Sequence, residues 1–418
     1  MSVYHSASSL PNRSRPRRRL VVILLAVVLA ALAALAGVQL TRKPPPVALR
    51  LSVPAALSIP GQVTGVPWPR QGQAQLDVVG LGTLGRSGGH ASVPIGSVAK
   101  MMTAYLVLTD HPLDADQPGP AITVTAADVA DYRSRIPSGQ SLVRVAAGER
   151  LTERQALQAL MLPSANNVAA ILAKWDAGSV DAFVAKMNST AARLGLADTH
   201  YTDPSGFEPT TVSSAADQTM LAEKALKLPA FAEIVAQRKA TLPVAGTVRN
   251  YNDLLGTYGV FGIKTGSTDE AGGNLVFAAR LAVAGRTLTI VGAVLGQPGK
   301  DTPEQLVAVN AVTRKLLSAA KRLVRAYEVL PAAGVGDVRA AWGGSVPVRT
   351  AAAVKVIGWP GLPVTVAIER VTPGSQVRTG QHLGTVTART GLGAVTTDLR
   401  AEADLAGPSW SWRLTRTS

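Results

Sequence analysis

Residues 94–104 read Pro-Ile-Gly-Ser-Val-Ala-Lys-Met-Met-Thr-Ala and place Ser97 and Lys100 at the start of an apolar helix. Side chains three positions apart in a helix project from the same face, so this hydroxyl and this amine can enter one cleft. A serine hydroxyl is a weak nucleophile until a neighbouring base removes its proton, and a desolvated lysine can be that base. The spacing therefore indicates a nucleophilic Ser97 with Lys100 as its base.

The same Ser-x-x-Lys spacing occurs a second time, at Ser318-Ala319-Ala320-Lys321. This copy follows every other motif and lies in an amphipathic stretch, so we interpret it as solvated helix surface.

Two further polar motifs follow the first one along the chain. Ser164-Ala165-Asn166 comes after an apolar helix end, where a hydroxyl and a carboxamide can relay a proton and position a substrate amide; taken alone, it also fits an ordinary helix cap. Lys264-Thr265-Gly266 lies in a predicted strand and is followed by Ser267. An ammonium and a hydroxyl there suit a carboxylate, and the glycine lets a substrate backbone come close.

In this order, the three motifs resemble those of the penicillin-binding D-alanyl-D-alanine carboxypeptidases; penicillin-binding proteins share this motif set with serine β-lactamases. The resemblance covers about residues 71–330 and includes Asp203-Pro204-Ser205-Gly206 and the segment 262–268. It implies a serine peptidase that removes the terminal D-Ala from peptidoglycan stem pentapeptides through an acyl-enzyme and is trapped covalently by β-lactams. The implied catalytic residues are Ser97, Lys100, Ser164 and Asn166; the implied substrate-binding residues are Lys264, Thr265, Gly266 and Ser267.

The resemblance also assigns each group a role. Ser97 would be acylated with Lys100 as base, and Ser164 and Asn166 would transfer a proton and position the substrate. The backbone N–H groups of Ser97 and Ser267 would hold the oxyanion.

Two alternative functions share parts of this pattern of motifs. A serine β-lactamase needs a deacylating carboxylate, and the nearest candidate, Glu223, begins a segment that ends in lysine where Asn is required. A catalytically idle wall-binding scaffold would retain the fold but usually lose a motif residue, and endopeptidase or transpeptidase activity could use the same site.

The pattern of apolar residues predicts an α+β fold, with an antiparallel sheet, flanking helices and an all-helical subdomain. Helices are expected at 98–108, 153–162, 168–175, 180–194, 216–228 and 303–329, and strands at 74–79, 260–265, 274–282 and 287–295. Beyond residue 331 the pattern is strand and turn, which predicts a small β domain at 331–418 ending in a strand at 409–414.

The segment Leu20–Leu40 is apolar throughout and long enough, as a helix, to span a bilayer. The arginines before it predict a cytoplasmic amino terminus and an exported remainder, with a cleaved signal peptide as the alternative. The expected organisation is a basic cytoplasmic tail at 1–19, a transmembrane anchor at 20–40, a Pro-rich linker at 41–70, a catalytic domain at 71–330 and the β domain. The protein would therefore be a single-pass protein of the cytoplasmic membrane with its catalytic domain on the cell-wall side.

Composition excludes several other classes. The formal net charge is +15, but seven of these charges flank the apolar segment, at Arg13, Arg15, Arg17, Arg18, Arg19, Arg42 and Lys43. The rest are scattered, so we expect no nucleic-acid binding. The chain has no cysteine, and its five histidines lack metal-ligand spacing, so we expect no metal and no cofactor.

Overall fold

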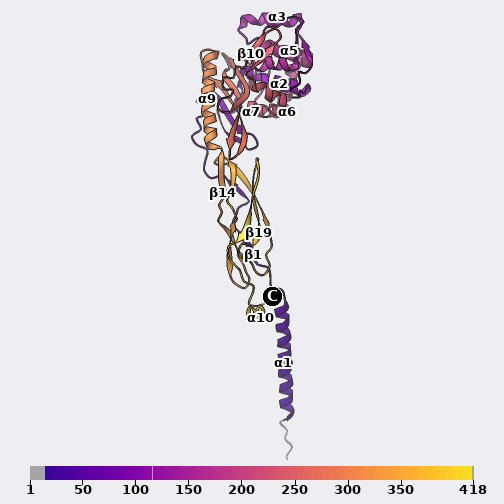
Figure 1. The fold of residues 1–418 in the computed structure, drawn as a ribbon, viewed down its shortest axis with the longest axis vertical. Helices are drawn as coiled ribbons and strands as arrows, with labels where there is room; N and C mark the ends of the chain where they lie inside the picture. Colours follow the sequence, from indigo (N-terminus) through magenta and orange to yellow (C-terminus); the bar gives the residue numbers. More distant parts are fainter. Residues whose placement is uncertain (1–14, 115, 417–418) are drawn as a thin grey trace, which may run out of the picture.

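The computed structural model describes residues 15–114 and 116–416. Most of the expected basic tail, including Arg13, lies outside these residues. Figure 1 shows an elongated chain, with a long helix at one end, a narrow β region in the middle and a mixed region of sheet and helices at the other end.

The first element is α1 (Arg15–Thr41), which contains the apolar segment. Nearly all of its described side chains are solvent-exposed; Leu20, for example, is 68% exposed. Within the described part of the chain, its stretch Arg17–Thr41 is the one helix that is long and apolar enough to cross a membrane. A helix with apolar side chains on all sides, contacted by other elements only near its end, is typical of a membrane-spanning segment.

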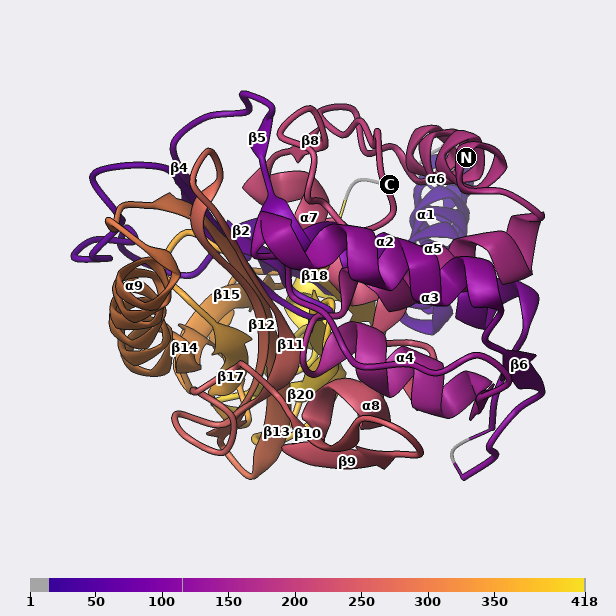
Figure 2. The same cartoon turned by 90° about the horizontal axis from the view of Figure 1, so that it is seen from above.

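A five-stranded antiparallel sheet forms the centre of the mixed region, in the order β11-β12-β13-β3-β4. Its strands are β3 (Gln73–Val78), β4 (Gly82–Ser87), β11 (Val260–Thr268), β12 (Gly272–Val283) and β13 (Arg286–Gln297). Alternate residues of β12 serve two cores: Phe277 packs in one with α9 (Thr302–Leu323), whereas Val276 packs in the other with the helical subdomain. Seen from above, α9 covers one face of the sheet and α2 lies on the other (Figure 2).

The helical subdomain is the part of the chain between β4 and β11. Its elements are β5 (Val93–Pro94), η1 (Gly96–Ala99), α2 (Lys100–Asp110), β6 (Ala121–Thr123), α3 (Ala126–Arg135), η2 (Ile136–Ser138), β7 (Arg150–Thr152), α4 (Glu153–Met161), α5 (Asn166–Ala177), α6 (Val180–Leu194), β8 (Val212–Ser213), α7 (Ala215–Ala225), α8 (Pro229–Ala236), β9 (Lys239–Leu242) and β10 (Gly246–Arg249). Most of α2 is buried, which agrees with its nearly continuous apolar sequence. Together, sheet and helices confirm the expected α+β fold.

The helix expected at 303–329 is shorter than predicted. It ends at Leu323, and β14 (Arg325–Leu330) follows and pairs with β17 (Val354–Gly358). Tyr327 and Val329 belong to residue types that favour strands, and pairing with a partner far along the chain decides between the two structures.

The β region is built mainly on a seven-stranded sheet, in the order β1-β15-β16-β20-β19-β18-β2. Its strands are β1 (Ala48–Leu51), β2 (Ala56–Ser58), β15 (Gly334–Arg339), β16 (Ser345–Thr350), β18 (Pro363–Arg370), β19 (His382–Thr390) and β20 (Gly393–Ala401). The Pro-rich segment therefore differs from the extended spacer expected at 41–70, because it supplies both edge strands. Edge strands tolerate proline, since one row of their backbone groups needs no partner.

The strand expected at 409–414 is wrong. These residues form α10 (Trp410–Thr415), and the Ser409 hydroxyl accepts a hydrogen bond from the Trp412 backbone N–H at 3.2 Å. The alternation of tryptophan with serine and arginine suggested a strand, but a capping serine at the first position favours a helix.

Candidate active site

Ser97 lies in the 3-10 turn η1, three residues before Lys100, where α2 begins. The Lys100 Nζ lies 2.7 Å from the Ser97 Oγ and donates a hydrogen bond to it. Lys100 is completely buried although it carries an amine. The spacing of three residues thus brings nucleophile and candidate base into direct contact, as expected from the sequence.

A loop formed by Asp203-Pro204-Ser205-Gly206 holds Lys100 from the other side. Lys100 also donates to the backbone carbonyl of Ser205 at 2.8 Å. The Asp203 carboxylate shapes this loop by accepting hydrogen bonds from the backbone N–H groups of Ser205 and Gly206 at 3.0 and 3.1 Å. The family resemblance found in the sequence includes this segment but implies no role for it. In the structure, the segment presents a backbone carbonyl to the buried amine of Lys100.

Electrostatics favour the neutral form of Lys100. Burial, above all, holds the pKa of Lys100 well below its usual value, and the nearby cations of Lys264 and Arg135 lower it further, while Asp203 acts in the opposite direction. A neutral amine 2.7 Å from the Ser97 hydroxyl can accept its proton.

The loop between α4 and α5 brings in the second motif. Ser164 has a left-handed backbone with φ of 66°, which is uncommon for a residue with a side chain. Its side chain is buried, and its Oγ has no hydrogen-bond partner among the described residues. A buried, unsatisfied hydroxyl in a strained turn is typical of a functional site.

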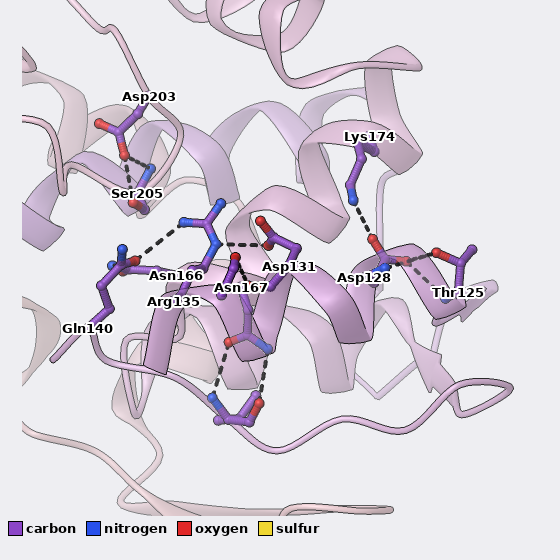
Figure 3. A network of polar contacts seen from close by, with 12 residues as sticks. Thr125, Asp128, Asp131, Arg135, Gln140, Asn166, Asn167, Lys174, Asp203 and Ser205 are labelled. Carbon is purple, nitrogen blue, oxygen red and sulfur yellow. Dashed lines mark hydrogen bonds and ion pairs between the residues drawn. The ribbon is translucent and has the colours of Figure 1, made fainter. Parts of the chain in front are cut away.

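Asn166 begins α5 and faces the same cleft. Its Nδ2 donates to the Gln140 Oε1 at 2.9 Å, whereas its Oδ1 has no partner within the described ranges. Gln140 is held in turn by Arg135, whose Nη1 donates to the same oxygen at 3.3 Å and whose Nε donates to Asp131 at 2.8 Å. Figure 3 shows this chain of contacts from Asp131 through Arg135 and Gln140 to Asn166. The carboxamide is therefore oriented with its acceptor oxygen free.

Sequence reasoning missed Arg135 and Gln140 as part of the site. They precede Asn166 by more than twenty residues and belong to no short motif, so only the folded chain brings them together.

The third motif lies on β11, an edge strand of the central sheet. Lys264 is almost fully buried, and its Nζ donates to the backbone carbonyl of Thr265 at 2.9 Å. Burial lowers the pKa of Lys264 to about 7. Near neutral pH this amine is therefore poised between its charged and neutral forms.

Gly266 and Gly96 allow β11 to approach η1 very closely. A Cβ on Gly266 would lie 2.8 Å from the Ile95 carbonyl oxygen and 3.0 Å from the Ser97 backbone nitrogen. Gly96 has a φ of +51°, and a Cβ there would lie 3.1 Å from the Ser267 backbone nitrogen. The Ser267 side chain is engaged with α9, since its Oγ donates to the Gln305 Oε1 and lies 3.0 Å from the Thr302 Oγ1. The backbone nitrogens of Ser97 and Ser267 therefore belong to two segments pressed against each other at the nucleophile.

Seven of the eight predicted site residues line or contact one cleft at this junction, and the eighth, Lys264, is buried on β11 beside Thr265 and lowers the pKa of Lys100. A cleft of about 390 Å³ is lined by Ser97, Ser164, Asn166, Thr265, Gly266 and Ser267, and the buried Lys100 contacts the wall that carries Ser97. The second Ser-x-x-Lys copy lies elsewhere, on the exposed side of α9, where the Ser318 Oγ donates to the carbonyl of Arg314. In the part of the chain that the structure describes, no group of His, Cys, Asp and Glu side chains could hold a metal ion.

A family model described as D-alanyl-D-alanine carboxypeptidase, peptidase family S11, matches residues 84–297, about half of the chain. The chain belongs to this family. The match contains all three motifs, and membership makes the protein a serine-type hydrolase, as expected from the ordered motifs.

Several known proteins and solved structures are similar to this S11 peptidase. The D-alanyl-D-alanine carboxypeptidase of Streptomyces sp. strain K15 is 36% identical over 217 residues, which cover 48% of this chain and 71% of that protein. The crystal structure of the Streptomyces K15 DD-transpeptidase superimposes with a TM-score of 0.54 at 29% identity and covers 62% of this chain and 100% of that one. Penicillin-binding protein 5 of Haemophilus influenzae, at 22% identity and a TM-score of 0.56, covers 81% of this chain. This last likeness concerns the fold alone and reaches beyond the residues that match the family.

Proposed function

We propose that the protein is a D-alanyl-D-alanine carboxypeptidase that removes the terminal D-Ala from peptidoglycan stem peptides, with Ser97 as the nucleophile. The observation that carries this proposal is the 2.7 Å contact between the Ser97 Oγ and the Nζ of a completely buried Lys100. Burial keeps the amine able to accept a proton, which is what a serine nucleophile needs.

In the acylation step, the Ser97 Oγ attacks the carbonyl carbon of the penultimate D-Ala while its proton passes to the Lys100 Nζ. The backbone N–H groups of Ser97 and Ser267 stabilise the oxyanion, a contribution of about 3 kcal/mol for a single well-placed donor. The C–N bond then breaks, and the proton reaches the departing D-Ala amine through the Ser164 hydroxyl, whose oxygen has no other described partner. The Asn166 Oδ1 accepts a hydrogen bond from the substrate amide.

Lys264 and Thr265 bind the terminal carboxylate of the substrate. Thr265 lines the cleft directly, and the buried Lys264 ammonium adds the charge that a carboxylate requires. Gly266 lets β11 lie against η1, so that Thr265 and Ser267 flank the nucleophile. After D-Ala leaves, water attacks the ester carbon, and Ser97 recovers its proton as the shortened peptide is released.

β-Lactams are proposed to acylate the same serine. Their ring opens during acylation, and because the leaving group stays tethered, it blocks the water that would hydrolyse the ester. The alternative of a β-lactamase finds little support in Glu223, which lines a separate hollow with Asp77 and His90.

Residues 20–40 are proposed as a single membrane anchor. The arginines that precede them keep the amino terminus in the cytoplasm, and the catalytic region at about 71–330 then faces the cell wall. In Figure 1 the β region separates the central sheet from α1, so the cleft would act at a distance from the membrane surface.

The proposal is tested by labelling the detergent-solubilised full chain with a fluorescent penicillin. The Ser97→Ala variant should lose covalent labelling, whereas Ser318→Ala, which changes the other Ser-x-x-Lys copy, should label like the wild type. Labelling that persists in Ser97→Ala would refute the assignment.

Release of D-Ala from a pentapeptide, followed by mass spectrometry, tests the reaction itself. A carboxypeptidase gives the tetrapeptide, whereas transfer to an added amine would indicate a transpeptidase. Rapid turnover of a β-lactam would favour the β-lactamase alternative, and a chain that neither labels nor releases D-Ala would be an idle scaffold.

A further inference from the structure

A cluster of basic residues lies far from the cleft, where the end of α1 meets α10. Two arginines near the carboxy terminus bind the last carbonyl groups of the first helix. The Arg413 Nη1 donates to the Leu40 carbonyl at 3.3 Å, and the Arg416 Nη2 donates to the carbonyls of Gln39 and Arg42 at 3.3 and 2.8 Å. The final carbonyls of a helix lack partners within the helix and carry a partial negative charge, so these cations stabilise its end. Segments more than 370 positions apart thus form one junction.

Three tryptophans, Trp342, Trp410 and Trp412, lie at or near this junction. The rings of Trp342 and Trp412 pack edge to face with their centroids 5.6 Å apart, and the Arg416 guanidinium lies 5.7 Å from the centre of the Trp412 ring. Trp410, on the same short helix, is 72% exposed, more than any other large apolar side chain among the described residues. Tryptophan is enriched where a membrane meets water, because its ring suits the headgroup region.

A hollow of about 550 Å³ opens beside these rings, lined by Arg42, Lys43, Pro45, Ala341, Trp412, Thr415 and Arg416. Three of these side chains are cations and none is an acid. Arg42 and Lys43 are exposed and directly follow the apolar helix. Figure 1 places α10 beside the end of α1 that joins the β region, which is where the helix would leave the hydrocarbon.

We propose that this junction is a binding site for the phosphate headgroup of an anionic phospholipid in the outer leaflet. Arg42 and Lys43 bind the phosphate, Arg416 adds positive charge while its guanidinium donates to backbone carbonyls beside the hollow, and Trp410 inserts at the level of the headgroups. The occupant is a lipid, because Arg42 and Lys43, which line the hollow, directly follow the apolar helix that is proposed to span the bilayer. The site rests on the proposed membrane anchor but not on the proposed catalysis.

A lipid bound at this junction would limit the orientations that the protein can take relative to the membrane. A single helix leaves the rest of the chain free to tilt, whereas a bound headgroup and an inserted tryptophan fix a second point. The junction lies at the end of the β region nearest the proposed membrane. A lipid bound there would therefore restrict the angle between the β region and the membrane surface.

The test is native mass spectrometry of the full chain, released from a zwitterionic detergent and titrated with phosphatidylglycerol. Each cation near an anionic lipid surface strengthens binding about fivefold, so the double variant Arg42→Gln/Lys43→Gln should bind this lipid about 25-fold more weakly. Arg389→Gln removes an exposed cation from β19, away from the junction, and is the matched control; it should bind like the wild type. Equal binding by the double variant and the control would overturn the proposal.

A second measurement separates the site from general attraction to the cytoplasmic arginines. In nanodiscs containing phosphatidylglycerol with brominated chains near the headgroup, tryptophan fluorescence of the wild type should be quenched, and Trp410→Phe should lose most of this quenching. Quenching that is unchanged in Trp410→Phe would place Trp410 outside the membrane and overturn its role. Penicillin labelling should be unaffected in every variant, so failure of this proposal is distinguishable from failure of the proposed catalysis.

Discussion

Replacement of Gly266 by alanine tests how closely β11 must approach η1 for catalysis. The added Cβ would lie 2.8 Å from the Ile95 carbonyl oxygen, 2.9 Å from the Val98 nitrogen and 3.0 Å from the Ser97 nitrogen. All three are backbone atoms of one short segment, so no side chain can rotate away. Gly266 does not have a positive φ, and alanine is therefore acceptable to the backbone itself.

Relief of these contacts needs η1 and β11 to separate by roughly half an ångström, because carbon atoms pack favourably only at about 3.5 Å or more. The same movement would pull apart the backbone N–H groups of Ser97 and Ser267. Loss of one oxyanion donor costs about 100-fold to 1,000-fold in rate, so partial displacement should slow acylation by about 10-fold to 100-fold. Overpacking should also reduce the free energy of unfolding by about 1–3 kcal/mol.

The assay is stopped-flow measurement of acylation by a fluorescent penicillin, together with a thermal melt that shows the variant is folded. Gly374→Ala is a suitable control, because a Cβ there would meet no atom within 4 Å and the residue has no positive φ. If folded Gly266→Ala acylates within about twofold of the wild type, the backbone nitrogens of Ser97 and Ser267 do not form the oxyanion site as argued.

Two further changes probe buried ionisable groups. Lys264→Ala should lower kcat/KM for a D-Ala-D-Ala peptide at least about tenfold, or about 1.4 kcal/mol, by removing the cation that faces the terminal carboxylate. Because the pKa of Lys264 is lowered to about 7, its charge is lost as pH rises, so wild-type kcat/KM should have a falling limb near that pH which the variant lacks; identical pH profiles would contradict this role. Glu153 is fully buried, both its carboxylate oxygens lack partners among the described residues, and burial raises its pKa to about 7. The unfolded chain ionises near the ordinary value of 4.5, so the relative stability of the folded state declines as pH rises from there through 7. Glu153→Gln should accordingly increase the free energy of unfolding by about 1–3 kcal/mol at pH 8 and change it little at pH 4.5; denaturant melts at both pH values measure this, and equal effects would exclude ionisation as the cause.

Local signals in the sequence were sufficient for most elements. The helix expected at 180–194 is α6 with the same bounds, and the strands expected at 274–282 and 287–295 lie within β12 and β13. Strong periodicity and clear end signals explain this agreement. The elements predicted wrongly or missed include β1, β2, β14 and α10, which are short, and three of these pair with strands far along the chain. The helices α3 and α8 and several short strands, among them β5 to β10, were missed as well.

The residues of the candidate active site also fall into those that the sequence could predict and those that only the fold reveals. Ser97 and Lys100 could be paired from the sequence because they are separated by a single helical turn. Arg135 and Gln140 could not, because their contact with Asn166 depends on how α3, the following loop and α5 pack. The perturbed pKa values of Lys100 and Lys264 likewise follow from burial, and burial is a property of the folded chain.

The amino-acid sequence by itself determined which chemical groups the protein has, the apolar segment long enough to span a bilayer and the order of the three motifs, because each is carried by neighbouring residues. The tertiary structure alone decided that a hydroxyl and a free carboxamide oxygen line one cleft next to two buried amines, and that α10 returns to the end of α1. Such meetings depend on the packing of distant segments, and the free energy of packing is summed over the whole fold rather than over any short stretch of it.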